Sequence, residues 1–247
     1  MHELTPDAES PARHTERDHG GIGGHPRGLS MLFYAEMWER FSYYGMRALL
    51  LLFMITPLAM GGLGFDQKFA AQVYGNYTMA SYMVCILGGY LADNFTGARR
   101  AVLVGGLIIT VGHYALAFDS VATFYAGLIL IALGTGLLKP SISTLVGGLY
   151  SHGDTRRDAG FSLFYMGINI GAFTANFLAA YTRNEWAWEA AFVGAGCGML
   201  ASVVILLASW KTLEASDRTP GSNPGDTPFS EILGKILGPA FLFGFLG

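Results

Sequence analysis

The feature that most constrains the fold is the grouping of apolar residues into blocks separated by short polar connections. Blocks of roughly 20 residues or more match the ~30 Å hydrocarbon core of a bilayer. Only 13% of the 247 residues are charged, about half the share of a soluble domain. The sequence therefore predicts an all-α membrane protein. We place six spans at about 29–55, 68–92, 100–118, 121–149, 158–182 and 187–210.

The polar segments divide the chain into four regions. Residues 1–28 form a polar tail without the apolar core and cleavage site of a signal peptide, and 29–210 hold the six spans. Residues 211–228 are rich in Pro, Gly, Ser and Asp, which indicates a solvated linker. An apolar helix is predicted to start in 229–247, and the chain stops partway through it. We interpret the chain as the first half, plus a little, of a larger transporter-like protein, with a natural six-helix protein as the alternative.

Basic residues fall mainly on one side of the predicted spans. They occupy the tail, the second and fourth connections and the linker: Arg13, Arg17, Arg27, Arg99, Arg100, Arg156, Arg157, Lys211 and Arg218. The other side carries Lys68 and Arg183. By the positive-inside rule, the N-terminus is expected in the cytoplasm, with the chain in the inner membrane.

Several functional classes are excluded by composition. The net charge of −3 comes without a basic or acidic tract, which argues against nucleic acid. Cys85 and Cys197 lie within predicted spans and indicate neither a disulfide framework nor a metal site. The spans contain no metal-ligand cluster and no nucleophile–base pair, so we expect neither an enzyme, a metal nor a cofactor.

Four charges lie inside the first apolar block. An ionisable side chain at mid-membrane costs about 2.5–3.5 kcal/mol on insertion scales and usually faces the bundle interior or a cavity. At about 100° per residue, the polar side chains of 36-EMWERFSYYGMR-47 share one face about 140° wide. They are Glu36, Glu39, Arg40, Tyr43, Tyr44 and Arg47. The pattern predicts a charged and aromatic stripe along an interior cavity.

Two interpretations of this stripe remain open. In one, Glu36 pairs with Arg40 at i+4 and merely locks helices together. That explains Arg47 poorly, because no acid lies one turn away on its own helix. In the other, Arg47 holds an anionic ligand group such as a carboxylate.

Lys139 is a second charge at mid-span, directly before Pro140. A proline frees a helical carbonyl and lets the helix bend, and a lysine beside such a break suits ligand binding or charge exchange. In the fifth span, polar residues recur at helical spacing: Ser162, Tyr165, Asn169 and Asn176. They line a cavity or form interhelical hydrogen bonds. His113 in the third span is interpreted as a packing residue.

Several of these stretches resemble known family motifs. The connection 88-GGYLADNFTGARR-100 resembles the G-x-x-x-D-x-x-x-G-x-R-R loop of the major facilitator superfamily. The first span is similar to the E-x-x-E-R-F-x-Y-Y-G motif of proton-coupled oligopeptide transporters. The stretches 134-GTGLLKP-140 and 164-FYMGINIGAF-173 resemble that family's motifs in helices 4 and 5.

The resemblance implies a fold and an activity. The fold is the N-terminal six-helix bundle of the superfamily, built from 3+3 inverted repeats, plus the start of a further helix. The activity is proton-coupled symport of di- and tripeptides across the cytoplasmic membrane by alternating access. Protons are the coupling ion. The family's second half would supply the acid that receives the peptide amino terminus, so this chain alone is expected to lack a complete pocket.

The resemblance also implies roles for individual residues. Proton coupling is assigned to Glu36, Glu39 and Arg40. Substrate binding is assigned to Tyr43, Tyr44, Arg47, Tyr82, Lys139 and Asn169. Gating by the loop after the second span is assigned to Asp93, Arg99 and Arg100. The chain departs from the family pattern at Ser141, where Asn is frequent, and near Tyr82, where a proline common in the family is replaced by a residue such as Cys85.

Two alternatives to peptide symport remain. Arg47 and Lys139 require only a negative group, so the same scaffold could carry another anionic solute such as nitrate. The chain could also be a truncated half that does not transport and assembles with a partner.

Overall fold

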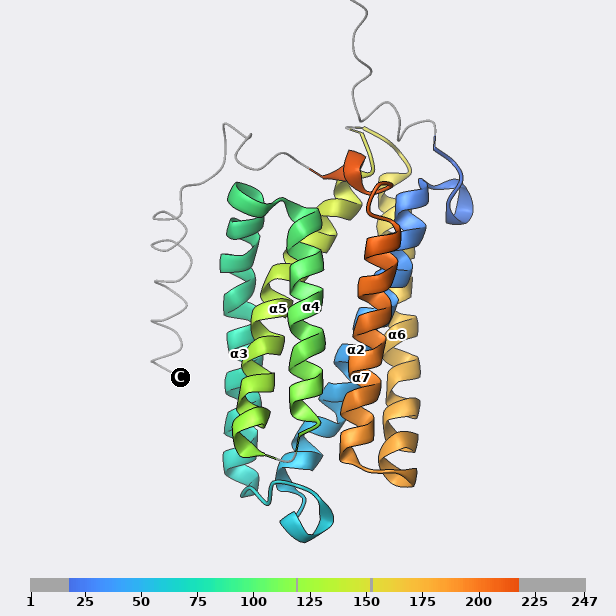
Figure 1. The fold of residues 1–247 in the computed structure, drawn as a ribbon. Coiled ribbons are helices and arrows are strands. Elements are labelled where there is room, and N and C mark those ends of the chain that lie inside the picture. Colours follow the sequence, from blue (N-terminus) through green and yellow to red (C-terminus); the bar gives the residue numbers. More distant parts are fainter. Residues whose placement is uncertain (1–17, 119, 152, 218–247) are drawn as a thin grey trace, which may run out of the picture.

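Each predicted span corresponds to one long helix in the computed structural model, which describes residues 18–118, 120–151 and 153–217 (Figure 1). The six long helices are α2 (Arg27–Ile55), α3 (Gln67–Leu91), α4 (Ala98–Leu116), α5 (Val121–Gly148), α6 (Arg157–Glu185) and α7 (Trp188–Ala208). Short turns of helix join them: η1 (Ile22–Gly24), η2 (Leu58–Met60), η3 (Ala92–Thr96) and η4 (Glu214–Ser216). The predicted all-α six-helix bundle is confirmed. The predicted helix within 229–247 lies outside the described residues.

The helix ends follow local chemistry. α2 begins directly after Pro26 and ends before Pro57, where a proline cannot continue the backbone hydrogen bonding. Asp66 caps α3, because its carboxylate accepts the backbone N–H groups of Lys68 (2.9 Å) and Phe69 (3.4 Å). Gly97 has φ +78° at the turn into α4, a conformation that favours glycine.

The bundle consists of two three-helix units, α2–α4 and α5–α7, and the first helix of each unit packs against the other unit. α2 lies along α6 and α7, whereas α5 lies along α3 and α4. Figure 1 shows the result as two groups of three helices, with α4 and α7 in contact between them. This reciprocal exchange fits the inverted repeats expected for the two three-helix units α2–α4 and α5–α7.

α4 and α5 form the tight antiparallel hairpin that the short connection at 117–120 predicts. Glycines allow the two backbones to approach. A Cβ added at Gly134 or Gly105 would meet the backbone of the other helix, and the same holds for Gly112 and Gly127.

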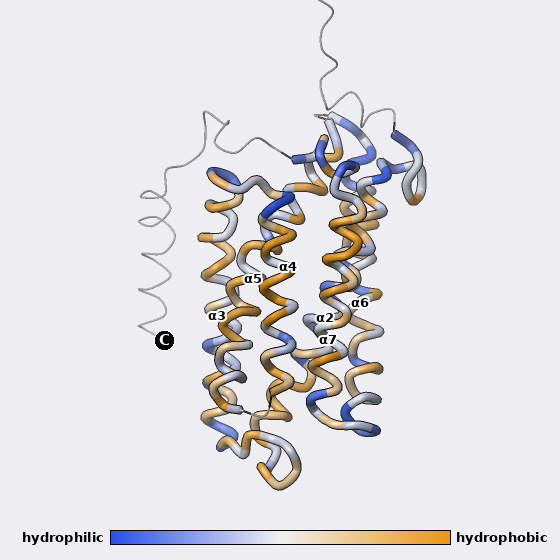
Figure 2. The backbone as a smooth tube through the Cα atoms, in the orientation of Figure 1, coloured by the Kyte–Doolittle hydropathy of each residue, from blue (hydrophilic) through white to orange (hydrophobic). Residues whose placement is uncertain are grey.

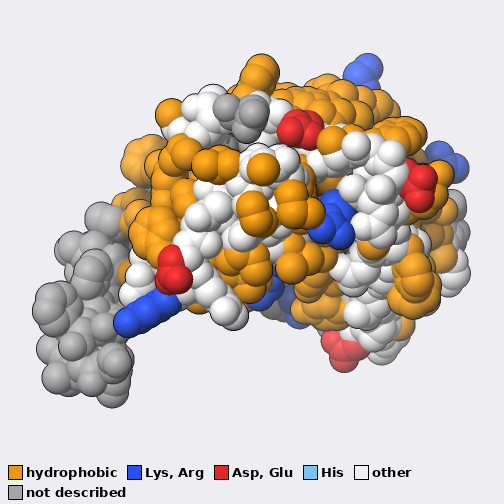
Figure 3. Space-filling model, turned by 90° about the horizontal axis from the view of Figure 1, so that it is seen from below, with side chains coloured by type: hydrophobic (Ala, Val, Ile, Leu, Met, Phe, Trp, Pro, Cys, Tyr) orange, Lys and Arg blue, Asp and Glu red, His pale blue; other side chains and the backbone are white. Residues whose placement is uncertain are grey.

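The bundle is apolar along its length and polar at its ends (Figure 2). By length and composition alone, α5, α6 and α7 are long and apolar enough to cross a membrane within the described residues. The other three helices, α2, α3 and α4, coincide with predicted spans. At the lower end of Figure 1, seen in Figure 3, charged side chains of both signs are scattered among hydrophobic ones.

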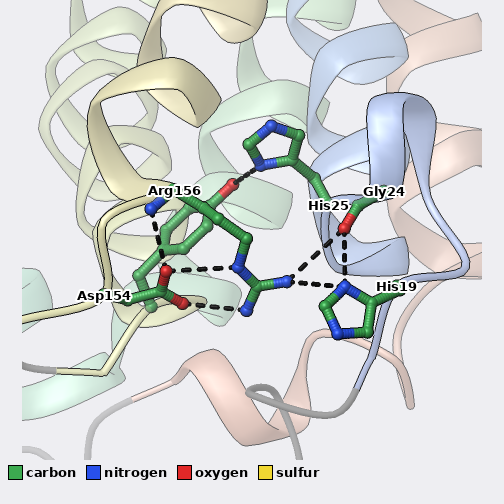
Figure 4. A network of polar contacts seen from close by, with 6 residues as sticks. His19, Gly24, His25, Asp154 and Arg156 are labelled. Atoms are coloured by element: carbon green, nitrogen blue, oxygen red, sulfur yellow. Dashed lines mark hydrogen bonds and ion pairs between the residues drawn. The ribbon is translucent and has the colours of Figure 1, made fainter.

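The segment before α2 folds back onto the turn between α5 and α6 (Figure 4). His25 Nδ1 lies 2.8 Å from the Tyr150 hydroxyl, and both side chains are buried. Their rings pack edge to face at 6.0 Å. Burial raises the pKa of Tyr150 to about 12, so the phenol stays protonated at neutral pH. This contact ties the start of α2 to the end of α5.

Arg156 provides a second link between these two segments (Figure 4). Its guanidinium bonds the Asp154 carboxylate in bidentate fashion, with Nε–Oδ1 at 3.1 Å and Nη2–Oδ2 at 2.8 Å. Nη1 reaches the carbonyl of Gly24 (3.4 Å) and Nδ1 of His19 (3.1 Å). Hydrogen bonds from Arg156 hold the pKa of Asp154 below its usual value.

Candidate functional site

A buried ion-pair cluster occupies the middle of α2. Glu36, Glu39 and Arg40 are 3%, 1% and 4% exposed. Arg40 Nε lies 2.9 Å from Glu36 Oε1 and also pairs with Glu39 Oε2. The i+4 pairing of Glu36 with Arg40, one of the two interpretations left open by the sequence, is therefore present, and Glu39 joins it. One guanidinium faces two carboxylates, which leaves the cluster with one uncompensated negative charge.

The cluster is not fully satisfied by hydrogen bonds. Among the described residues, Oε2 of Glu36 and Nη2 of Arg40 are buried side-chain atoms that make none. Burying a charged atom without a partner lowers the stability of the fold, because no interaction in the protein replaces the hydration that the atom loses. A purely structural ion pair would be expected to satisfy these atoms, and this cluster does not.

α6 makes room for the cluster. A Cβ added at Gly171 would collide with the Met37 carbonyl oxygen and would lie 3.1 Å from Arg40 Cβ. Glycine at this position lets α6 approach α2 at the level of Arg40. Gly167 allows the same close approach a turn earlier in α6, against Phe33.

Tyr43 lies one turn after Glu39 and is surrounded by cations. Its ring centroid is 5.2 Å from Arg40 Cζ, 5.8 Å from Arg47 Cζ and 5.2 Å from Lys139 Nζ. These distances are within the range of cation–π attraction. The structure thus brings Arg40, Arg47 and Lys139 together around one buried ring. Tyr44 packs its ring edge to face against Tyr43 at 5.3 Å.

Arg47 is held by two tyrosines. Its Nε donates to the Tyr74 hydroxyl and its Nη1 donates to the Tyr43 hydroxyl at 3.3 Å. The Tyr74 ring also lies 5.6 Å from Arg47 Cζ. Sequence reasoning missed Tyr74. It precedes Tyr82 by eight residues, which puts the two side chains about 80° apart around the helix, so spacing alone did not single it out.

Lys139 projects from α5 toward α2 and α3. Its ammonium lies 5.2 Å from the Tyr43 centroid and 5.4 Å from the Tyr82 centroid. Within the described residues it has no carboxylate within 4.0 Å. The half-buried ammonium thus lies against two aromatic faces, at distances where cation–π attraction operates, and it also interacts electrostatically with Glu39 and Glu36.

Other predicted residues lie apart from this cluster. Asn169 is exposed, and its Nδ2 donates to the Tyr165 carbonyl on its own helix at 3.0 Å. Asn176 Nδ2 likewise donates to the Ala172 carbonyl on its own helix. His113 is fully buried between the Ile109 carbonyl (2.9 Å) and Ser42 Oγ (3.3 Å), which fits the packing role expected for it.

The predicted gating residues lie at the end of the bundle that carries the segment before α2. Arg99 donates to the Trp210 carbonyl at 2.7 Å, stacks on that ring at 4.4 Å and pairs with Asp217 at 3.5 Å. It therefore fastens the segment after α7 to the start of α4. Asp93 lies in η3, and Arg100 is exposed on α4.

The charges around Tyr43 do not cancel. Arg40, Arg47 and Lys139 against Glu36 and Glu39 leave one net positive charge around Tyr43. Protonation of either carboxylate would add a second positive charge, which strengthens attraction for a negative ligand.

Comparison with known proteins gives a consistent family assignment. Residues 99–234 match the POT family. The chain is 46% identical over 185 residues to the "Peptide transporter YePEPT" of Yersinia enterocolitica and 43% identical over 190 residues to a "Di-/tripeptide transporter" of Lactococcus lactis. A crystal structure of "peptide transporter POT in complex with sulfate" superposes with a TM-score of 0.80 at 40% identity.

The chain spans about half the length of these proteins or less. The alignments cover 74% and 76% of this chain but 36% and 38% of the two relatives. The superposition covers 96% of this chain and 49% of the solved chain.

Proposed function

The chain belongs to the POT family, and we propose that it forms the N-terminal half of a transporter that imports di- and tripeptides together with protons. The observation that carries the proposal is the cluster around Tyr43. Two carboxylates share the single guanidinium of Arg40, and two further cations have no carboxylate partner among the described residues. Relatives named peptide and di-/tripeptide transporters support the substrate class.

Glu36, Glu39 and Arg40 would form the proton site. Their burial means that each charged oxygen without a partner is costly, so a proton on one carboxylate relieves the excess negative charge. Arg40 would then keep one ionised partner. The proton moves with the carboxylate through the transport cycle and is released on the other side of the membrane.

Arg47 and Lys139 would bind the peptide C-terminal carboxylate. Tyr74 and Tyr43 orient the Arg47 guanidinium, whose planar donors suit a carboxylate. Lys139, on α5, would add a second positive charge beside the peptide carboxylate. Tyr44 and Tyr82 would line the pocket beside these cations, and Asn169, exposed on α6 apart from them, would contact another part of the peptide. Closing the pocket requires the second half of the transporter.

We further propose that the end bearing Arg27, Arg99 and Arg156 faces the cytoplasm, in the inner membrane. The basic residues of the connections support this orientation by the positive-inside rule. Asp93, Arg99 and Arg100 would then belong to the cytoplasmic gate, where Arg99 fastens the segment after α7.

Uptake of a labelled dipeptide into proteoliposomes tests the proposal. The protein is this chain joined to the second half that the family carries. We expect accumulation under an inward proton gradient, abolished by a protonophore, and competition by unlabelled tripeptide. Competition by nitrate with none by tripeptide would instead establish transport of another anion. Absence of any gradient-driven uptake would refute symport.

A further inference from the structure

A second pocket lies between α3 and α5, which pack side by side (Figure 1). Its volume is about 310 Å³, and we call it the lateral pocket. The described residues that line it all belong to these two helices, and none of them is charged. The three cations and two carboxylates around Tyr43 take no part in the lining, so the lateral pocket is distinct from the candidate site.

The lateral pocket lies on the side of α3 that faces away from the candidate site. At about 100° per residue, Val73, Ala80 and Val84 of the lining lie roughly 160–180° around the helix from Tyr82. Tyr82 marks the opposite side, because its ring lies 5.4 Å from the Lys139 ammonium. The second half of the transporter would close the candidate site on the Tyr82 side, which leaves the lateral pocket outside the path of the peptide.

Burial shows the direction in which the lateral pocket opens. Tyr77, Leu128 and Ala132 form its floor and are 6%, 5% and 6% exposed. Ile129 and Leu133 form its rim and are 60% and 45% exposed. The pocket is therefore a hollow with a buried floor that opens outward from the described bundle.

The position along the helices places this opening within the membrane. At 1.5 Å per residue, Val73 lies about 9 Å from the first residue of α3, and Val84 lies about 10 Å from the last. α5 is long and apolar enough to cross a membrane. The hydrocarbon core of a bilayer is ~30 Å thick, so the outward face at this depth meets lipid acyl chains.

The chemistry of the lining also fits an acyl chain. Asn76 contributes one amide, Tyr77 and Tyr125 contribute aromatic rings, and the other lining side chains are aliphatic. A buried water needs two to four polar partners, which such a lining does not supply. Apolar side chains that face a gap lose dispersion contacts, and a flexible hydrocarbon chain can restore these contacts.

We propose that the lateral pocket binds one acyl chain of a membrane phospholipid, packed against the Tyr77 ring. This lipid site is independent of the proposed function, because it is defined by α3 and α5 alone. It adjoins the candidate site, since Tyr77 interacts electrostatically with Glu39, Tyr43 and Arg47. Tyr77 thus separates a bound lipid chain from the residues proposed to bind protons and peptide.

Photocrosslinking in cell membranes identifies what covers the opening. In the complete transporter, Ile129→p-benzoylphenylalanine places a photoreactive ketone at the rim. After irradiation, mass spectrometry is expected to show the transporter with the added mass of a phospholipid. A crosslink to a peptide of the second half or of another copy would overturn the proposal, because a protein helix would then cover the opening. Absence of a lipid adduct would overturn it as well.

Native mass spectrometry of the purified transporter tests whether the chain is held in the pocket. Ala80→Phe fills the lateral pocket from α3, and with phosphatidylglycerol as the probe it should raise the apparent Kd of the tightest bound lipid by about tenfold or more. Val111→Phe is the matched control, because Val111 is 58% exposed on α4 and does not line the pocket. Its lipid affinity should equal that of wild type. Equal affinity for wild type and Ala80→Phe would overturn the proposal.

Two further measurements keep the test decisive. Ile129→Trp narrows the opening from α5 and should weaken lipid binding as Ala80→Phe does, so the result does not depend on the folding of one variant. Thermal unfolding of each variant checks its fold. Glycerophosphoglycerol carries the head group without acyl chains and should not compete with phosphatidylglycerol. Competition by it would assign the binding to a head group and contradict the acyl-chain site.

Discussion

Removal of the Arg40 guanidinium is the perturbation that most directly probes the buried cluster. Arg40→Met keeps the length of the side chain but leaves Glu36 and Glu39 without a cation, at 3% and 1% exposure. Breaking a buried ion pair by removing one partner costs about 3–5 kcal/mol, because the remaining charge is buried and unpaired. At ~2–4 °C per kcal/mol, the melting temperature should fall by roughly 6–20 °C.

Thermal unfolding of the detergent-solubilised transporter at pH 7.5 measures this effect. The control is the triple variant Glu36→Gln, Glu39→Gln, Arg40→Met, which removes all three charges together. It should recover most of the lost stability, because replacing a complete buried cluster is often neutral. If Arg40→Met melts within 2 °C of wild type, the carboxylates are not held by Arg40 as described.

Three further outcomes follow from the geometry. Gly171→Ala pushes α6 away from Met37 and should destabilise the protein by about 1–3 kcal/mol in thermal unfolding, whereas Gly194→Ala, with no atom within 4 Å of the added Cβ, should not. Tyr74→Phe removes the hydroxyl that accepts from Arg47, and should weaken the binding of dipeptides with a free carboxylate by about tenfold or more. Binding of the corresponding dipeptide amides should not change. Equal losses for both would contradict the role of Arg47 in binding the carboxylate. Acidification below about pH 4 should lower amide-exchange protection of residues 18–27. In the folded protein the pKa of Asp154 lies below its ordinary value of 3.8. The bonds of its carboxylate to Arg156 therefore stabilise the fold fully above pH 3.8, and this stabilisation is lost as the pH falls through the folded-state pKa. Asp154→Asn should remove this acid step; persistence of the step would place its origin elsewhere.

The sequence predicted the positions of helices and the residues that share a helix face better than it predicted which distant residues contact one another. Apolar block length places a helix to within a few residues, as for α5, predicted at 121–149 and observed at Val121–Gly148. Helical periodicity correctly placed Glu36, Glu39 and Arg40 on one face, because neighbours three and four residues apart meet on any α-helix.

Contacts between distant segments were not predictable in this way. Arg99 was assigned to a gating loop, but its pairing with Asp217, 118 residues away, depends on which helix ends lie together. The link between His25 and Tyr150 spans 125 residues. Periodicity describes one helix at a time, so it could not show that three cations converge on Tyr43.

Gradient-driven accumulation by Glu39→Gln tests the central claim most directly. In proteoliposomes with an inward proton gradient, the complete wild-type transporter should concentrate a labelled dipeptide above its external level. Glu39→Gln removes one of the two carboxylates that share Arg40 and should lose this accumulation. Accumulation by Glu39→Gln equal to that of wild type would contradict the assignment of this buried cluster to proton coupling.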